Sequence, residues 1–348
     1  MKDNLLDVIR SVEVDFNLDP DFSAGWDHLQ SIVIREQPLR QRVVQEIVTG
    51  ANLRFFPGID VIFEGQENIP SQGPFIITMN HTDDYNYLPL TLALTRQDLY
   101  SAVWIKDKNY DNAAQRAFFD SMGMIPVHPA GAFLRRLYKS QFGRDAATFF
   151  SGQKYKDVKD VFDGKVTKEE MLKRDLDVES AYFVRRMDDI RDYHQALMQK
   201  VGSLTLEAFD KGLYLLVFPE GSRSVRLSEG RTGVAEVALH TEIPVIPIGC
   251  NGGDRIYPPH SAPLARGPSG FWKSFLPNAA RGVVVYNIGK PLTVDDALRP
   301  YRIKDEFELF SPDSQVKYAS RFKGARDVIM YSIHGLLDER HQNKERYG

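Results

Sequence analysis

Two short polar stretches hold the residues of this chain that are best suited to chemistry. The first is NHTDDYN at residues 80–86, and the second is EGSR at residues 220–223. His81, in the first stretch, can act as a general base, because the unperturbed pKa of histidine is about 6.5. Arg223, in the second stretch, can bind a phosphate through two hydrogen bonds, and the neighbouring glycine lets main-chain amides approach an anion. The two stretches are therefore candidates for a catalytic base and an anion-binding loop.

Both polar stretches follow apolar runs that are typical of buried strands. Residues 75–79 precede the first stretch and are bounded upstream by Gly73 and Pro74, and residues 213–218 precede the second. A third run, residues 243–248, has strand character and contains two prolines. Since α/β proteins commonly place their chemistry at the ends of strands, we expect both polar stretches at strand ends.

The order and spacing of these segments resemble the glycerol-3-phosphate and lysophosphatidic-acid (1-acylglycerol-3-phosphate) O-acyltransferase superfamily. The family's Asn-His block is matched at Asn80 and His81, and its Phe-Pro-Glu-Gly-Thr-Arg-Ser block is matched at residues 218–224, with Ser222 for threonine. Its Val-Pro-Val-Val-Pro-Val type strand is matched at residues 243–248. The resemblance extends from about residue 60 to residue 292, with a long interruption in the middle.

Two positions depart from the family's pattern. The family has an aspartate five residues after its histidine, and this chain has Asn86 there. The family's second block, which residues 123–128 fit only loosely, usually ends in arginine, and this chain has His128, with Arg135 and Arg136 shortly after it. The resemblance therefore identifies a divergent member.

The resemblance implies transfer of a fatty acyl group from acyl-CoA or acyl carrier protein to a hydroxyl, with His81 as general base and no covalent intermediate. A carboxylate on the other ring nitrogen would fix the tautomer and stabilise the imidazolium. Three alternatives stay open for that partner. Asp84 (or Asp83) takes the role through an altered loop, which we prefer because Asp84 lies one turn from His81; Asn86 suffices; or the protein is a catalytically weak relative.

The resemblance also implies a glycerol-phosphate or lysophospholipid-type acceptor, and hence a role in phospholipid and lipid metabolism. The residues expected to bind substrate are Glu220, Gly221, Ser222, Arg223, Arg231 and His128. Arg231 stands where family members have a lysine in a comparable segment. Two alternatives remain: acylation of a non-phosphorylated glycosyl or secondary-metabolite alcohol, which the weak second block allows, and a non-catalytic protein that binds lipid or an acyl carrier.

Composition excludes several other classes of protein. The net charge of −3 gives no overall attraction to nucleic acid, so we expect no nucleic-acid partner. One cysteine, Cys250, excludes an internal disulfide framework, suits a reducing cytosol and is expected to be a buried thiol. The start lacks the features of a signal peptide, and no apolar run reaches the ~18 residues of a membrane span. We expect a cytoplasmic protein, with peripheral membrane contact left open. We expect no metal and no cofactor beyond the acyl-CoA or acyl carrier protein co-substrate.

The pattern of the chain predicts an α/β fold with a central mixed β-sheet flanked by helices. We expect an N-terminal helical segment at residues 1–56 and an acyltransferase domain at 57–348 that carries a helical insertion at about 133–212. A face of apolar residues between Leu39 and Val48 supports the first helical segment. Further strand candidates are residues 59–63, 100–105, 124–127 and 283–288.

Within the insertion, residues 167–170 (TKEE) have the arrangement of a capping box. An apolar stripe from Phe183 to Leu204 predicts a sustained helix, long enough for a helical hairpin or a dimer contact. His194 lies on that stripe and is expected to be packed. The insertion fits a cover for the acyl-donor entrance, or a surface that binds a carrier protein through Arg185, Arg186 and Arg191; the alternative, which we prefer, is a solvated basic face. Residues 318–337 predict an amphipathic helix, and the charged end at 341–348 is expected to fray.

Overall fold

The computed structural model describes residues 20–36, 39–55, 58–83, 85–110, 113–143, 152–256 and 281–348. The chain divides into two compact units. The helical unit consists of His128–Met198 together with the residues up to Ile32, and the sheet unit consists of Val33–Val127 and Gln199–Gly348. Helix α12, Met187–Asp210, begins in the helical unit and ends in the sheet unit. The predicted boundaries at residues 56 and 57 and at about 133–212 stay a prediction.

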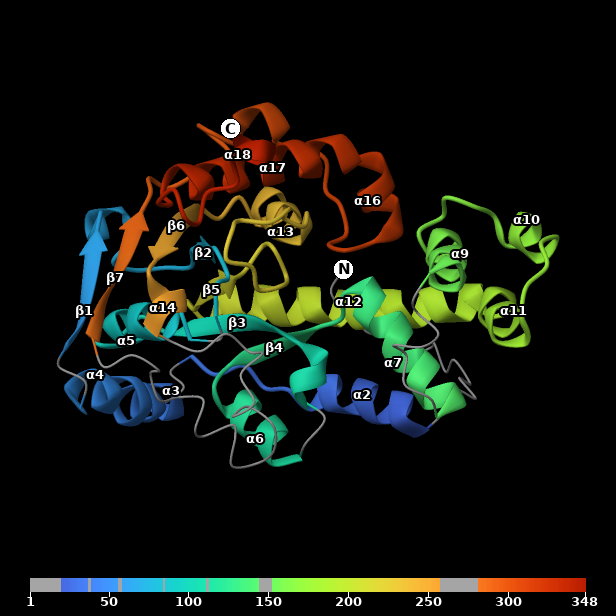
Figure 1. The fold of residues 1–348 in the computed structure, drawn as a ribbon, viewed down its shortest axis with the longest axis horizontal. Helices are drawn as coiled ribbons and strands as arrows, with labels where there is room; N and C mark the ends of the chain where they lie inside the picture. The colour runs from blue at the N-terminus through green and yellow to red at the C-terminus, as the bar shows by residue number, and fades with distance from the viewer. Residues whose placement is uncertain are drawn as a thin grey trace. The chain divides into compact units, whose positions relative to one another are not determined.

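Seven strands of the sheet unit form one mixed sheet, in the order β1-β7-β6-β2-β5-β3-β4 (Figure 1). The neighbours β6, β2, β5, β3 and β4 are parallel, whereas β7 is antiparallel to β6 and parallel to β1. The carboxyl ends of the five parallel strands therefore lie at one edge of the sheet, which confirms the predicted α/β fold with a central mixed sheet. The strands are β1 (Gly58–Glu64), β2 (Ile76–Met79), β3 (Ser101–Lys106), β4 (Met124–Val127), β5 (Tyr214–Val217), β6 (Val245–Asn251) and β7 (Arg281–Ile288).

Burial of the strands follows their amino-acid pattern. Strands β2, β5 and β6 are buried along their whole length, as expected of parallel strands covered on both faces, and they read as nearly continuous apolar runs. In β1 and β7, at the side of the sheet, buried and more exposed residues alternate. The predicted strands agree with the observed ones within a few residues. The largest difference is in β6, which begins at Val245 and continues to Asn251.

Helices cover the sheet and connect its strands. Helix α17 contacts α13, β2 and β6, whereas α5 contacts α3 and the π-helical segment η1. In Figure 1, α13 and α17 lie on the opposite side of the sheet from α3 and α4. The helices of this unit are α3 (Leu39–Val44), η1 (Gln45–Gly50), α4 (Ala51–Phe55), α5 (Leu88–Thr95), α6 (Ala113–Ser121), α13 (Gly233–Thr241), α14 (Gly253–Ile256), α16 (Pro312–Lys317), α17 (Ala319–Gly335) and α18 (Lys344–Tyr347), with three short 3₁₀ turns, η2 (Gln66–Asn68), η3 (Asp107–Tyr110) and η5 (Arg299–Tyr301).

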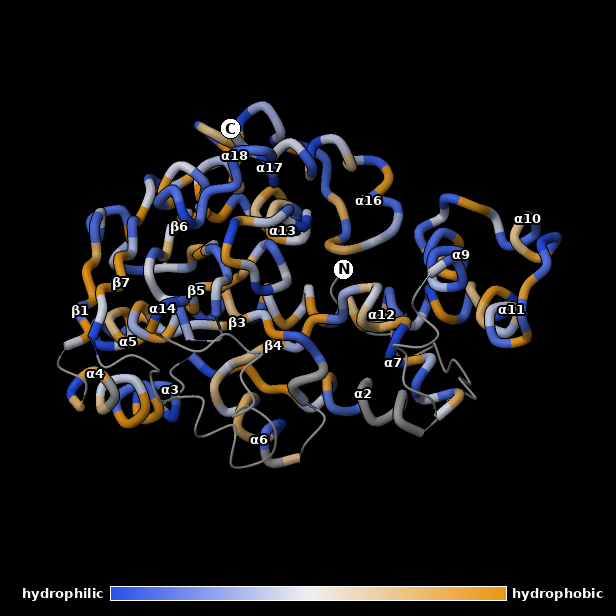
Figure 2. The backbone as a smooth tube through the Cα atoms, in the orientation of Figure 1, coloured by the Kyte–Doolittle hydropathy of each residue, from blue (hydrophilic) through white to orange (hydrophobic). Residues whose placement is uncertain are grey.

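The described part of the predicted N-terminal segment is helical, as expected, and part of its apolar face is exposed; residues 1–19 of that segment lie outside the described residues. Figure 2 shows stretches of hydrophobic residues along α3 and α4. Val43, Ile47 and Phe55 are 54%, 66% and 78% exposed. Across the described part of the chain, no helix has the length and apolarity that crossing a membrane would require.

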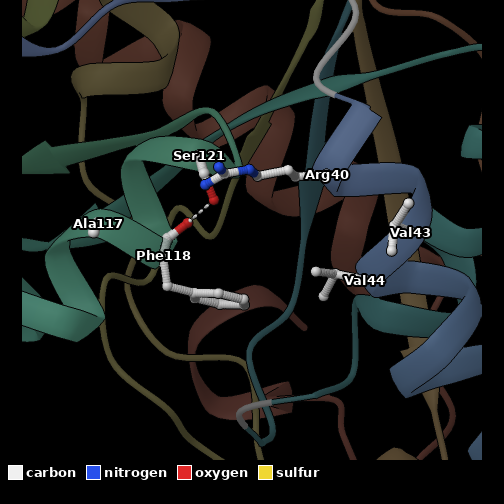
Figure 3. Close-up of a pocket in the computed structure, with 6 residues that line it drawn as sticks. All are labelled: Arg40, Val43, Val44, Ala117, Phe118 and Ser121. Carbon is white, nitrogen blue, oxygen red and sulfur yellow. Dashed lines mark hydrogen bonds between the residues drawn. The ribbon is translucent and has the colours of Figure 1, made fainter.

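A hollow of about 330 Å³ lies between α3 and α6 (Figure 3). Gln41, which follows Arg40 in the sequence, donates from its side-chain amide to the carbonyl oxygens of Ser101 and Met122, at the amino ends of β3 and β4. The hollow therefore lies near the edge of the sheet opposite the carboxyl ends of the parallel strands. It is lined by Arg40, Val43, Val44, Ala117, Phe118 and Ser121.

The helical unit is built around aromatic and aliphatic side chains. Its helices are α2 (Pro20–Ser31), α7 (Ala130–Phe142), α9 (Gln153–Phe162), α10 (Lys168–Leu172), α11 (Val178–Arg185) and the first part of α12. The capping box at the start of α10 is confirmed, since Thr167 and Glu170 each accept from the other's main-chain amide. His194 is packed as predicted, with its ring centroid 4.8 Å from that of Phe133 and 5.2 Å from that of Phe162.

Two of the three arginines that were considered as a carrier-protein surface make contacts inside this unit. Arg191 donates to the carbonyl oxygens of Val161 and Phe162 at the end of α9. Arg186 donates to the Tyr182 hydroxyl at 2.7 Å. These two side chains therefore hold the unit together, whereas Arg185 is exposed.

The expectation that the chain end frays is wrong. His341 is fully buried, and residues Lys344–Tyr347 form helix α18. The preceding amphipathic helix is confirmed as α17, whose buried residues include Phe322, Ile329 and Ile333.

Candidate active site

The two polar stretches meet because the strands before them are parallel neighbours. Thr78 of β2 pairs with Val217 of β5, so both chains leave the sheet side by side at its carboxyl edge. The stretches are then joined through the main chain of His81. Its amide donates to Glu220 Oε1 at 2.7 Å, and its carbonyl oxygen accepts from the Ser224 amide at 2.8 Å.

The His81 ring lies flat against Phe218. The two ring centroids are 4.0 Å apart with an interplanar angle of 20°, and Tyr87 meets Phe218 edge-on at 5.9 Å. Burial, which is the largest cause, and the positive charges of Arg223 and Lys106 together lower the pKa of His81 to about 3. The imidazole is therefore neutral at physiological pH, which is the form that a general base requires.

Asn86 lies on the buried side of the imidazole. Its Nδ2 donates to the Asn80 carbonyl oxygen at 2.7 Å, which leaves Oδ1 as the acceptor. His81 Nδ1 and Asn86 Oδ1 are both buried and make no hydrogen bond of normal geometry. The Asn86 side chain and the Asp83 main chain nevertheless act to raise the pKa of the ring, which means that they favour its protonated form. This arrangement suits a proton on Nδ1 and leaves Nε2 as the basic nitrogen. A carboxylate at position 86 could not donate to Asn80.

The loop around Asn86 is anchored to β6 and β7. Asn80 exchanges two hydrogen bonds with the main chain of Cys250, at 2.7 and 2.9 Å. Tyr286 donates its hydroxyl proton to the Asn86 carbonyl oxygen at 2.7 Å. Cys250 is fully buried and burial raises the pKa of its thiol well above the ordinary value, so the predicted buried thiol is confirmed.

Of the two candidate aspartates, the structure places one. Asp84 lies outside the described residues. Asp83 is fully buried, and its carboxylate accepts from the Tyr85 amide at 2.8 Å and the Thr82 hydroxyl at 2.9 Å. Burial raises the pKa of Asp83 to about 6. Its carboxylate thus shapes the loop that follows His81.

Glu220 is bound on both carboxylate oxygens by the protein itself. Oε1 accepts from the His81 amide, and Oε2 accepts from the amide and hydroxyl of Ser228 at 2.7 and 2.8 Å. Burial raises the pKa of Glu220 to about 7, although these donors favour the ionised form. Glu220 was predicted to bind substrate; in this structure it joins His81 to the loop that follows Arg223.

Gly221, Ser222 and Arg223 form the turn after β5. Gly221 has a φ of +64°, a conformation that glycine adopts at little cost. A Cβ atom at this position would lie 2.7 Å from Nε of Arg231, so the Arg231 side chain passes directly over the glycine. Ser222 is exposed and Arg223 is partly buried. Both predicted cations, Arg223 and Arg231, are therefore brought to one loop.

A third cation was missed by the sequence reasoning. Lys106 is the last residue of β3, the parallel neighbour of β5, and its charge acts on His81. The predicted strand ended one residue earlier, at position 105, although a lysine at the carboxyl end of a strand was a usable signal. His128 belongs to the helical unit, where its carbonyl oxygen accepts from His194 Nε2 at 2.7 Å.

Within the described ranges, no group of three or more His, Cys, Asp or Glu side chains is arranged to hold a metal ion. The described site holds a neutral histidine, an amide beside it and nearby cations. A neutral imidazole can accept the proton of a hydroxyl, and cations beside it can stabilise negative charge.

The residues that build this site lie within a match to a known family. Residues 60–251 match the model described as Acyltransferase. The chain belongs to the Acyltransferase family. The recognition made from the motifs is thereby confirmed. Among solved structures, this acyltransferase is similar to the 1-acyl-sn-glycerophosphate (LPA) acyltransferase PlsC from Thermotoga maritima, with 16% identity over 92% of this chain and 95% of that chain and a TM-score of 0.38. No curated protein matches it.

Replacing Lys106 by methionine is expected to raise the pKa of His81, because one of the positive charges that oppose its protonation is removed. The ring-proton chemical shifts of His81, followed by NMR as the pH is lowered, measure this pKa. The exposed Lys304 provides a matched control, and Lys304→Met should leave it unchanged. An unchanged pKa in Lys106→Met would show that the lysine does not act on the ring.

Proposed function

We propose that this acyltransferase moves a fatty acyl group from the thioester of acyl-CoA or acyl carrier protein to a hydroxyl of a glycerol-phosphate or lysophospholipid-type acceptor. The observation that carries the proposal is the His81 ring, held neutral against Phe218 with its buried nitrogen beside Asn86. Arg223, Arg231 and Lys106 supply positive charge at the same edge of the sheet. A base and a cationic loop in one place fit an acceptor that has both a hydroxyl and an anionic group.

The reaction needs no covalent enzyme intermediate. His81 Nε2 takes the proton of the acceptor hydroxyl while the hydroxyl oxygen attacks the carbonyl carbon of the thioester. The new ester C–O bond forms, the C–S bond breaks, and the imidazolium returns the proton to the leaving thiolate. Asn86 Oδ1, or Asp84 if that loop residue reaches the ring, orients the imidazole through Nδ1.

The anionic group of the acceptor would have two effects: it would bind to the cations of the site, and it would raise the basicity of His81. A phosphate beside Arg223 and Lys106 offsets two charges that hold the pKa of His81 low. Bound acceptor would therefore make His81 a stronger base than it is in the free protein. A non-phosphorylated alcohol would lack this effect, which is why the phosphorylated class is preferred.

One observation favours a second candidate, a catalytically weak relative that binds acyl carriers or lipids. Asn86 has no negative charge to stabilise an imidazolium, and replacing a triad aspartate by asparagine costs about 10⁴ in turnover in serine proteases. The Asp83 carboxylate is engaged with Thr82 and Tyr85. Binding of acyl thioester without acceptor-dependent thiol release would support this second candidate.

The proposal is tested by thiol release. Acyl-CoA and acyl carrier protein thioesters of several chain lengths are incubated with glycerol 3-phosphate, a lysophosphatidic acid and a matched monoacylglycerol that lacks the phosphate. Release of thiol and formation of ester with the phosphorylated acceptors only is the expected result. Transfer to monoacylglycerol with equal efficiency would contradict the proposed acceptor class while leaving acyl transfer intact.

Arg223→Ala is expected to raise the acceptor KM about tenfold and to leave the donor KM nearly unchanged, because a charged hydrogen bond to phosphate is lost. Initial rates measured over a range of each substrate separate the two constants. Arg299 is an exposed arginine of η5, and Arg299→Ala serves as the matched control. Equal changes in both KM values would argue against a role of Arg223 in acceptor binding.

A further inference from the structure

The chain end forms a strap along the loop that follows Arg223. The C-terminal strap is defined as residues 338–348, and the motif loop as residues 224–229. The loop carries an exposed arginine, Arg226, between the exposed Val225 and the buried Leu227. Because more than a hundred residues lie between the loop and the strap, nothing local requires this contact.

The strap forms hydrogen bonds with main-chain groups on one side of the motif loop. His341 Nδ1 donates to the Val225 carbonyl oxygen at 2.8 Å, and the His341 carbonyl oxygen accepts from the Leu227 amide at 2.9 Å. Asn343 Nδ2 donates to the Leu227 carbonyl oxygen at 3.0 Å. The Tyr347 hydroxyl donates to the Ser228 carbonyl oxygen at 2.8 Å.

The other groups of the motif loop belong to the active site. The Ser224 amide donates to the His81 carbonyl oxygen, and the Ser228 amide and hydroxyl donate to Glu220. The loop is thus held between the catalytic residues on one side and the strap on the other. Its conformation depends on both, since a surface loop without such bonds would be free to move.

The strap itself is fixed to the end of β6. The Asp338 amide donates to Asn251 Oδ1 at 2.9 Å. Arg340 makes hydrogen bonds of 2.5 and 3.1 Å to Asp254, whose side chain is only 6% exposed. At the far end, Arg346 pairs with Glu229 of the loop at 2.9 Å. The contacts of Asp338 and Arg340 anchor the start of the strap, and its later residues bind the loop.

We propose that the C-terminal strap is a positioning element of the acceptor site, which holds the motif loop so that Arg223 and Arg226 meet the anionic group of the acceptor. This inference rests on the proposed function, because the acceptor is the ligand that the loop would bind. His341 and Tyr347 are positioning residues in this scheme, since they reach the acceptor only through Val225, Leu227 and Ser228. The strap contributes no group to the chemical step.

The test uses variants that remove hydrogen bonds of the strap. Tyr347→Phe removes only the hydroxyl that binds Ser228, whereas His341→Ala removes both the donor to Val225 and Nε2, which lies 3.4 Å from the Gly252 amide. His341→Gln keeps an amide donor and should therefore lose less loop protection and less phosphate affinity than His341→Ala. Glu345→Ala is the matched control, because Glu345 is an exposed residue of the same strap. Tyr347→Phe keeps the test decisive if His341→Ala fails to fold.

Two readouts do not depend on turnover. Deuterium exchange measures how tightly the amides of residues 224–229 are held, and calorimetric titration with inorganic phosphate measures anion binding by the full chain. Tyr347→Phe is expected to speed loop exchange and to weaken phosphate binding, each by about fivefold, which is the factor for one ordinary hydrogen bond. In rate measurements on Tyr347→Phe, the KM for the acceptor should rise while the KM for the donor stays constant.

Loop exchange and phosphate affinity at wild-type values in both Tyr347→Phe and His341→Ala would overturn the proposal. Equal effects on the two substrates' KM values would also overturn it, because they would indicate a general loss of structure. If the wild-type protein binds no phosphate, the proposed acceptor class fails, and loop exchange still decides whether the strap holds the loop.

Discussion

His81→Ala is expected to lower the kcat of acyl transfer by about 10²–10⁴, the contribution of a positioned general base. The ring is the only group of the described site that is neutral at physiological pH, stacked in place and partly accessible, with one nitrogen buried beside Asn86. Without it, no side chain of the described loop can take the hydroxyl proton. Initial rates of thiol release under saturating donor and acceptor measure the loss.

His240→Ala is the matched control for His81→Ala. His240 is another partly buried histidine of the sheet unit, whose pKa burial also lowers, but it packs against Phe307 and away from the motif residues. Its replacement should leave kcat near the wild-type value. If His81→Ala retains full activity in a preparation that transfers acyl groups, the proposed mechanism is refuted.

Glu220→Gln is expected to lower kcat/KM by about 10²–10³, although the side chain contacts no substrate in the proposed mechanism. Each carboxylate oxygen faces hydrogen-bond donors, from His81 on one side and Ser228 on the other. The amide group of glutamine must turn its own donor toward one of them, which leaves buried donors unpaired at a cost of about 1–3 kcal/mol each. The loop that carries His81 or the one that carries Ser228 then shifts.

The effect of Glu220→Gln is best measured at pH 8. Because burial raises the pKa of Glu220 to about 7, the carboxylate of the wild-type protein is largely ionised there. Glu236→Gln is the matched control, since burial also raises the pKa of Glu236 to about 7 and this carboxylate binds the Phe310 amide outside the site. The control should lower the free energy of unfolding while kcat stays close to the wild-type value. Equal losses of kcat/KM in both variants would refute a specific role of Glu220.

Much of the fold was predictable because its signals are local. Strands β2, β5 and β6 are apolar runs bounded by glycine or proline, and each predicted run lies close to its observed strand. The polar residues after the first two runs stand out for the same reason: an abrupt change from apolar to chemically competent side chains marks the end of a strand. His81, Arg223 and the family to which the chain belongs could therefore be named from the residues alone.

The capping box at Thr167 was predictable for a related reason. A side chain that binds an amide three residues away needs no information from the rest of the chain. By contrast, the seven-strand order could not be read from the sequence. The sheet places β2 between β5 and β6, and those pairings join residues more than a hundred positions apart.

The roles of individual residues in the site depended on tertiary structure. Glu220 was predicted to bind substrate, and the structure adds that its hydrogen-bond partners are the main-chain amide of His81 and a serine of the following loop. Asn86 stands where the family has an aspartate, and the structure adds that its amide donates to the Asn80 carbonyl oxygen. Main-chain donors and acceptors are the same at every residue, so a side chain that binds them leaves no pattern in the sequence.

The sequence by itself determined which residues are apolar, where strands end in polar stretches, and that the chain has the motifs of an acyltransferase. Only the tertiary structure decided that Lys106 joins the cations of the site and that the chain end, expected to fray, binds the motif loop through His341 and Tyr347. The physical reason is distance along the chain. Local burial and turn preferences act over a few residues, whereas hydrogen bonds between remote segments form only after the sheet has brought those segments together.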